Sequence, residues 1–355
     1  MLLAFSTSLM AAPQEVSNLN DFGGGSLRQA IIDVGAGEEI TFSVTGTITL
    51  TSGHLAIDKN LTITGPGTDQ LSIDGDASSR IFQIGTSSTN PTITITGLTM
   101  TNGNADYGGG IFNYSDNLTL ENCTISGNSV SDWGGGMYND SCFDSSSPTL
   151  TNCTISGNSA FNDGGGMYNL GYVGTSSPTL TNCTISGNSA FNDGGGMYNL
   201  GYEGTSSPTL TNCILWNDNA GSGGNEVFND SATPSYSYCD VEGCGGSGSW
   251  VSSFGTNNGN NIDSDPLFHS EPDPASAPQV VANHDLLLNN GSPCLGTGSV
   301  PGSAPSTDID GRSRPLPAGA SNVDMGAFEQ YNDGTLPVEL STFTAQFIEN
   351  IPTLY

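Results

Sequence analysis

The sequence predicts an all-β fold: a parallel β-helix, or solenoid, with a short N-terminal capping helix. Residues 148–177 (PTLTNCTISGNSAFNDGGGMYNLGYVGTSS) recur at 178–207 with one change, Val173 to Glu203. Residues 39–103 consist of short runs that alternate between apolar and polar residues, separated by Gly, Asp, Asn and Pro. Only one segment before them has a helical pattern. A fixed period of this kind is typical of stacked units, each covering the apolar face of the next.

Composition limits the partners. The 355 residues contain 5 Lys+Arg against 35 Asp+Glu, a formal net charge of −30. Such a surface repels phosphate, so nucleic acid and anionic membranes are poor partners. No carboxylate cluster has metal-ligand spacing, so we expect no cofactor and at most weak Ca²⁺ binding at exposed carboxylates. The histidines His54, His269 and His284 have no HxH or HxxxH partner, so we expect no metal site.

Residues 1–12 (MLLAFSTSLMAA) resemble the remnant of a secretory signal peptide, although the positively charged start is missing. The segment ends in small residues, and the chain then becomes polar. No later stretch reaches the roughly 18 apolar residues that a membrane helix needs. We therefore expect an exported protein, secreted or at the cell surface, without a transmembrane segment.

Residues 13–35 are predicted to cap the N-terminal end of the coil. Ser26 and Gln29 match a capping box, and Leu27, Ala30 and Ile31 share one helical face. An amphipathic helix here would cover strand edges and core that an open solenoid exposes.

Residues 36–245 are predicted to form the β-helix, with one turn for each 30-residue repeat. We expect three strands per turn, near residues 149–152, 153–157 and 166–169. Strand alternation predicts which side chains face the core. The inward residues are Leu150, Cys153, Ile155 and Met167, and the outward residues are Thr149, Thr151 and Thr154.

Equivalent residues on successive turns should lie about 4.8 Å apart and form ladders. An inward column of small side chains is predicted for Cys123, Cys153, Cys183 and Cys213. A side-chain amide ladder, at the bend between strands, is predicted for Asn122, Asn152, Asn182 and Asn212. Disulfides between adjacent cysteines of the column are geometrically possible, but we favour free thiols there. Cys239 and Cys244, in a glycine-rich stretch, are the better disulfide candidates.

Three motifs resemble bacterial surface β-helix proteins. GSLRQAI (25–31), followed by EEITFSVTGTITL, resembles their N-terminal region. GGGIFN (108–113) and the GGGMYN copies, alternating with TISGN, resemble the polymorphic outer membrane protein repeat and related pectate-lyase-like β-helices. This resemblance implies a right-handed β-helix associated with the outer membrane or cell surface.

Residues 246–330 resemble the C-terminal closing segment of such proteins. They contain DPLF (265–268), DIDGRSRP (308–315) and DMGAFE (324–329), but SPCLG (292–296) lacks the Asp that usually follows Ser-Pro. Residues 331–355 are predicted to be a linker and the truncated start of a further β domain. LPVELSTF (336–343) is similar to the region before a type IX secretion sorting signal.

The fold also occurs in pectate lyases and polygalacturonases, so a polysaccharide lyase or glycoside hydrolase is the alternative function. Such a lyase needs a Ca²⁺-binding carboxylate cluster beside a basic residue, and a hydrolase needs carboxylates roughly 5–10 Å apart. Asp163 and Asp193 lie in FNDGGG, where Asp commonly serves the turn. No Lys or Arg lies between Arg80 and Arg312. We therefore predict a non-catalytic protein without catalytic residues.

Binding is predicted on one row of loops. DSCFDSSS, LGYVGTSS and LGYEGTSS lengthen successive turns at the same place, and repeated insertions on one face of a solenoid often make contacts. Phe143, Tyr172 and Tyr202 would form an aromatic row that stacks on sugars or packs on a partner, unless the rings only cover the loops themselves. The outward threonines leave an ice-binding face as a lesser alternative. We predict a monomeric, adhesin-like scaffold that binds glycans or surface proteins.

Overall fold

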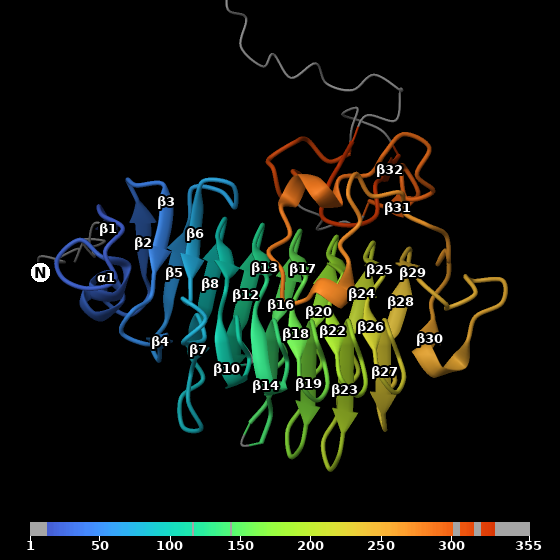
Figure 1. Ribbon diagram of the computed structural model, residues 1–355, viewed down its shortest axis with the longest axis horizontal. Helices are drawn as coiled ribbons and strands as arrows, with labels where there is room; N and C mark the ends of the chain where they lie inside the picture. The colour runs from blue at the N-terminus through green and yellow to red at the C-terminus, as the bar shows by residue number, and fades with distance from the viewer. Residues whose placement is uncertain (1–12, 116, 143, 301–305, 316–320, 331–355) are drawn as a thin grey trace, which may run out of the picture.

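The chain coils into a parallel β-helix whose axis follows the long dimension of the molecule (Figure 1). The computed structural model describes residues 13–115, 117–142, 144–300, 306–315 and 321–330. The predicted fold class is confirmed. The predicted signal peptide, Phe143 and the predicted C-terminal linker and sorting region lie outside the described residues.

In the described part of the chain, four parallel sheets run along the coil, with ten, eight, seven and five strands. The ten-stranded sheet contains β1 (Gln14–Val16), β2 (Glu38–Phe42), β5 (Leu61–Thr64), β8 (Ile93–Thr96), β12 (Leu118–Glu121), β16 (Thr149–Thr151), β20 (Thr179–Thr181), β24 (Thr209–Thr211), β28 (Ser235–Ser237) and β30 (Thr256–Asn257). The eight-stranded sheet contains β3 (Gly46–Thr49), β6 (Leu71–Asp74), β9 (Thr99–Thr101), β13 (Thr124–Ser126), β17 (Thr154–Ser156), β21 (Thr184–Ser186), β25 (Ile214–Trp216) and β29 (Asp240–Val241). The seven-stranded sheet contains β4 (Leu55–Ile57), β7 (Phe82–Ile84), β11 (Ile111–Asn113), β15 (Met137–Asp140), β19 (Met167–Gly171), β23 (Met197–Gly201) and β27 (Val227–Asp230). The five-stranded sheet contains β10 (Asn104–Tyr107), β14 (Ser129–Trp133), β18 (Ser159–Ala160), β22 (Ser189–Ala190) and β26 (Asn219–Ala220).

Each repeat makes one complete turn. Thr149 pairs with Thr179, and Thr179 pairs with Thr209, so the register advances by one 30-residue repeat. A turn such as β16–β17–β18–β19 has four strands, whereas the sequence predicted three. The additional strand has only two residues in the repeats, too few to show an alternating pattern.

The core is a continuous column of apolar side chains inside the coil. The predicted inward residues Leu150, Cys153, Ile155 and Met167 are all fully buried. Thr149 is exposed, as predicted. Thr154 is nevertheless buried, because a C-terminal segment covers the outer face of its sheet.

The helix α1 (Leu27–Asp33) lies at the N-terminal end of the coil (Figure 1). Ser26 caps it, accepting a hydrogen bond from the Gln29 backbone at 3.2 Å. The Gln29 side chain donates to Asp33 instead of completing the predicted capping box. The face that packs on the first turn consists of Leu27, Ala30 and Ile31. Among the described residues, no helix has the length and hydrophobicity needed to cross a lipid bilayer.

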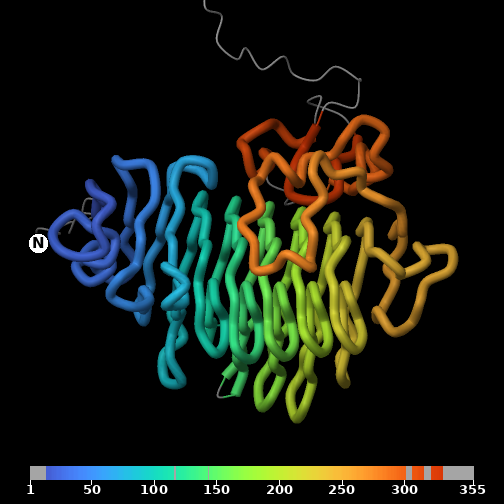
Figure 2. Tube along the Cα trace, viewed as in Figure 1, coloured from blue at the N-terminus to red at the C-terminus, as the bar shows by residue number. Residues whose placement is uncertain are grey.

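The closing segment lies along the side of the coil as well as at its end (Figure 2). Residues 246–262, with the 3-10 helix η1 (Ser252–Phe254) and β30, cover the end, where Trp250 packs against Tyr236. The described parts of the following segment, residues 263–300, 306–315 and 321–330, turn back over the eight-stranded sheet. They contain η2 (Pro274–Ser276), η3 (Asn283–Leu286) and the antiparallel pair β31 (Gly298–Ser299) and β32 (Asn322–Val323).

Backbone and side-chain hydrogen bonds hold this segment on the coil. Val281 N donates to Ser126 Oγ at 2.7 Å, and Ala327 N donates to Thr184 Oγ1 at 3.1 Å. Within the segment itself, buried Arg314 donates to the carbonyls of Asp324 and Gly326 at 3.0 and 3.1 Å. The outward-facing threonines of this sheet, such as Thr154 and Thr184, are therefore covered by the chain's own C-terminal segment.

Candidate binding surface

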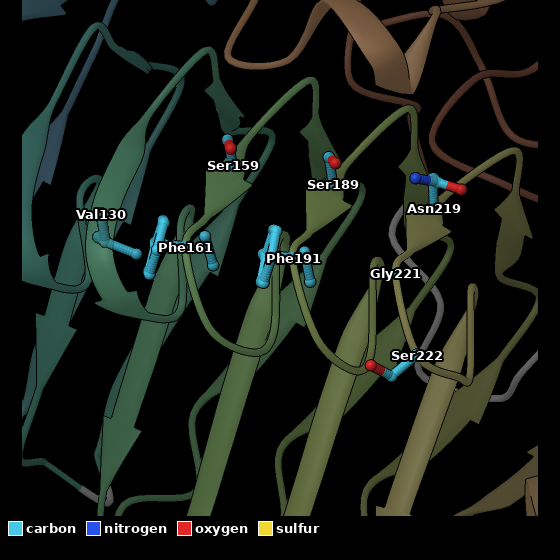
Figure 3. A pocket seen from close by; sticks show the side chains of 10 residues that line it. Val130, Ser159, Phe161, Ser189, Phe191, Asn219, Gly221 and Ser222 are labelled. Carbon is cyan, nitrogen blue, oxygen red and sulfur yellow. The ribbon is translucent and has the colours of Figure 1, made fainter.

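The outer face of the five-stranded sheet forms an open groove of about 620 Å³ (Figure 3). Short side chains of β18, β22 and β26 provide its polar groups, because residues of a strand alternate between inside and outside. The side chains that line it are uncharged: Val130, Ser159, Ala160, Phe161, Ser189, Ala190, Phe191, Asn219, Gly221 and Ser222.

Two exposed phenylalanines stand beside this groove. Phe161 and Phe191 follow β18 and β22 directly and are 62% and 66% exposed. Their rings are stacked, with centroids 5.4 Å apart and planes 3° from parallel. Hydrogen bonds from Phe161 N to Val130 O and from Phe191 N to Ala160 O, both 3.1 Å, fix the backbone that presents them. Exposure of two large apolar rings on rigid backbone indicates a contact surface.

Among the described residues, the aromatic contact of Phe161 and Phe191 is the one they make with each other. The ladder places Ser131 beside Phe161 in the preceding turn and Gly221 beside Phe191 in the following turn. A serine and a glycine therefore occupy the positions equivalent to the two phenylalanines in the neighbouring turns. The groove therefore offers aromatic rings together with Ser and Asn side chains, although the sequence at FNDGGG indicates only a turn.

Tyr172 and Tyr202 of the predicted aromatic row also stand together. Their rings are 5.2 Å apart and within 2° of parallel, and they are 41% and 64% exposed. The loops stack closely because glycine occupies position 204, where a Cβ would lie 1.9 Å from Gly174 O. Each ring covers one face of the other, as in the phenylalanine pair, and the tyrosines add a hydroxyl at each ring edge. The third member, Phe143, lies outside the described residues.

A longer aromatic column, missed in the sequence, runs along the outer face of the seven-stranded sheet. It comprises Phe112, Tyr138, Tyr168, Tyr198 and Phe228. Tyr168 and Tyr198 stack at 4.9 Å, and Tyr168 is almost fully buried. Burial, with the nearby charges of Asp163 and Asp230, raises the pKa of Tyr198 to about 12. This column stabilises the coil, and the aromatic residue after each GGGM or GGGI is the sequence signal for it.

The predicted asparagine positions form hydrogen bonds along the axis. Asn152 donates to Asn122, Asn182 to Asn152 and Asn212 to Asn182, at 3.0, 3.2 and 3.0 Å between Nδ2 and Oδ1. Each of these residues has a positive φ of 50–54°, which Asn tolerates better than most side chains. Asn152 and Asn212 also donate to the closing segment, at Thr307 O and Ser299 O. These side chains serve the scaffold.

All eight cysteines are described, and each has a free thiol. The column Cys123, Cys153, Cys183 and Cys213 is fully buried. The disulfide candidates Cys239 and Cys244 are not bonded to each other. Cys239 continues the column, accepting a hydrogen bond from Cys213 N at 3.4 Å, whereas Cys244 donates to Ile262 O at 3.4 Å.

Comparison with known proteins agrees with this architecture. Residues 39–199 match the family model described as "Right handed beta helix region". The chain is a right-handed parallel β-helix.

Solved structures include two similar folds. The β-helix is similar to the "Crystal structure of pectate lyase Pel9A", with 13% identity and a TM-score of 0.41, over 90% of this chain and 97% of that chain. It is also similar to "Geobacillus virus E2 - ORF18", with 14% identity and a TM-score of 0.24, over 63% of this chain and 61% of that chain. No curated protein sequence matches the β-helix. Likeness at these TM-scores carries no argument about activity.

The β-helix places Asp163 and Asp193 in structural roles. Asp163 Oδ1 accepts a hydrogen bond from Asp193 N at 3.1 Å, which links adjacent turns. Burial raises the pKa of Asp163, while hydrogen bonds from the Asp193 backbone and the Trp133 indole oppose the rise. Within the described ranges, no three or more His, Cys, Asp or Glu side chains are arranged to hold a metal ion.

The five basic side chains of the β-helix are held away from the groove. Arg28 pairs with Asp21 at 2.6 Å, and Lys59 donates to Val34 O at 2.6 Å. The Arg80 guanidinium lies 4.8 Å from the centre of the Phe112 ring. Arg312 pairs with Asp310 at 3.4 Å, and Arg314 is buried in the closing segment. A basic residue that could abstract a proton from a sugar is therefore not among the groove's lining residues.

Proposed function

We propose that this β-helix is a non-catalytic, adhesin-like scaffold, secreted or carried at the bacterial cell surface, that binds neutral glycans in the groove of its five-stranded sheet. The exposed Phe161–Phe191 stack beside Ser and Asn side chains carries the proposal. A sugar ring packs its C–H face on an aromatic ring, and its hydroxyls bond to nearby polar groups.

Charge favours a neutral ligand over an acidic one. The lining of the groove has no charged side chain, while the whole chain has a formal charge of −30. The field of such a surface repels anionic glycans, and no cation in the groove offsets the repulsion. Successive turns present like groups at a regular interval, which suits a ligand that itself repeats.

A glycan array tests the proposal with the wild type and two double variants. Phe161→Ala/Phe191→Ala removes the rings at the groove, and Tyr172→Ala/Tyr202→Ala is the matched control on the loops. Loss of about 1 kcal/mol per ring predicts roughly 30-fold weaker binding of neutral glycans by the phenylalanine variant. The tyrosine variant should bind like the wild type.

Three outcomes would count against the proposal. Equal binding by the phenylalanine variant would remove the groove as the site, and loss only in the tyrosine variant would move the site to the loops. New reducing ends or unsaturated products, in an assay run on the same glycans, would show an enzyme and overturn the non-catalytic assignment.

A further inference from the structure

A second polar ladder, inside the coil, ends in a pair of carboxyl groups. Asn128, Asn158 and Asn188 occupy equivalent positions on successive turns, and Asp218 follows them. In each step the backbone N–H and the side-chain Nδ2 of one residue both donate to the side-chain oxygen of the next. The last asparagine donates in this way to Asp218 Oδ1, at 2.7 and 2.8 Å.

At the end of this ladder, the Glu226 side chain occupies the place that the ladder residue of a further turn would otherwise take. Asp218 N donates to Glu226 Oε1 at 3.1 Å, the bond that the following asparagine would otherwise accept. Earlier turns have glycine at the position of Glu226: a Cβ on Gly166 would lie 3.1 Å from Asn188 Nδ2. The Glu226 side chain therefore fills space that the next ladder residue fills elsewhere.

One donor is missing from this arrangement when both groups are carboxylates. Each asparagine donates from Nδ2 to the next residue, but an ionised aspartate has no proton to donate. Asp218 Oδ2 and Glu226 Oε2 then have no hydrogen-bond partner, although both side chains are almost fully buried. The two groups lie close enough to hydrogen bond once one of them is protonated. A single proton would supply the missing donor.

We propose that Asp218 and Glu226 share one proton, which completes the ladder and makes the C-terminal end of the coil sensitive to pH. The third carboxyl group that acts on the pair is Glu242, which is exposed and accepts a hydrogen bond from Asn217 N at 2.9 Å. None of the ion pairs between described residues brings a Lys or Arg to this site. Loss of the proton leaves two buried negative charges in contact.

The direction of the pH effect follows from burial. Burial raises the pKa of Asp218 to about 7, with Glu242 adding to the rise, and it raises the pKa of Glu226 as well. A carboxyl group whose pKa is raised by folding contributes its full stability below its unfolded pKa, which is 3.8 for Asp218. That stability is lost as the pH rises through the folded value.

Hydrogen exchange of the full chain, measured by mass spectrometry, tests the proposal. After correction for intrinsic exchange, protection of β25 and β26 in the wild type should fall about tenfold per pH unit between roughly pH 5 and pH 7. Asp218→Asn and Glu226→Gln each provide an amide donor in place of the proton, so most of this fall should disappear in both variants. The part that remains reflects Asp240, which pairs with Ile214 of β25 and whose pKa burial raises to about 7 in all three proteins. Asp230→Asn, an exposed carboxyl on β27, removes the same charge and should behave like the wild type.

An independent readout is the infrared carbonyl band of a buried, protonated carboxylic acid. Near pH 6 this band should be stronger in the wild type than in Asp218→Asn, because the contribution of Asp240, whose pKa burial raises to about 7, is the same in both proteins. Two results would overturn the proposal: the wild-type pH dependence persisting in both amide variants, or added Ca²⁺ restoring protection at pH 8, which would mean that the pair holds a cation.

Discussion

The outer asparagine ladder makes a measurable contribution to stability, which replacement of Asn182 isolates. Asn182 donates to Asn152 at 3.2 Å and accepts from Asn212 at 3.0 Å, and its φ is +52°. Asn182→Ala removes both bonds, at about 1 kcal/mol each, and puts a residue that tolerates left-handed backbone less well than asparagine at this φ, at a cost of about 1 kcal/mol more. We expect the free energy of unfolding to fall by about 3 kcal/mol.

Asn182→Gly separates the two effects. Glycine tolerates the positive φ, so only the amide bonds are lost and we expect a decrease of about 2 kcal/mol. Urea unfolding followed by circular dichroism measures both variants, with protection of β20 and β21 in hydrogen exchange as the local readout. If both variants remain within about 0.5 kcal/mol of the wild type, the ladder does not stabilise the coil.

Three further predictions concern the loops, the closing segment and pH. Gly204→Ala should lower the free energy of unfolding by about 1–3 kcal/mol and speed proteolysis of the insertion loops, because the new Cβ would lie 1.9 Å from Gly174 O. An unchanged rate of cleavage would refute the close stacking of these loops. Arg314→Leu should remove the 3.5 Å contact with the buried Glu329 carboxylate and the bonds to two carbonyls of the closing segment, cost about 3–5 kcal/mol and speed proteolysis of that segment; resistance equal to wild type would contradict its role in holding the segment together. Burial raises the pKa of Asp240 to about 7 and of Asp324 to about 6, so the thermal midpoint should fall as the pH rises through this range, and a flat profile would contradict it.

The repeat alone predicts most of the coil. A period of 30 residues aligns the turns of the repeat region, and strand alternation then places Leu150, Cys153 and Ile155 in the core. The same logic places Tyr172 beside Tyr202, because insertions of equal length begin at the same point of each turn. Local spacing is sufficient for these features since stacked turns contact only their neighbours.

Two features have no local signal. The closing segment contacts residues far away in sequence, with 143 residues separating Ala327 from its partner Thr184, and no periodicity links such distant positions. The groove depends on the two-residue strand Ser159–Ala160. Ala160 is buried, and Phe161, the next residue, points outward. Alternation over two residues cannot be distinguished from a turn, so the exposed phenylalanine pair becomes visible only in three dimensions.

The central claim, that the groove holds a neutral glycan without cleaving it, is tested most directly by one titration. A neutral oligosaccharide that binds the wild type is titrated into the wild type and into Phe161→Ala/Phe191→Ala by isothermal calorimetry. The molecular mass of the recovered ligand is then measured by mass spectrometry. We predict roughly 30-fold weaker binding by the variant, about 1 kcal/mol for each ring, and an intact ligand in both samples. Equal affinity of the two proteins, or a ligand shortened by the wild type, would contradict the claim.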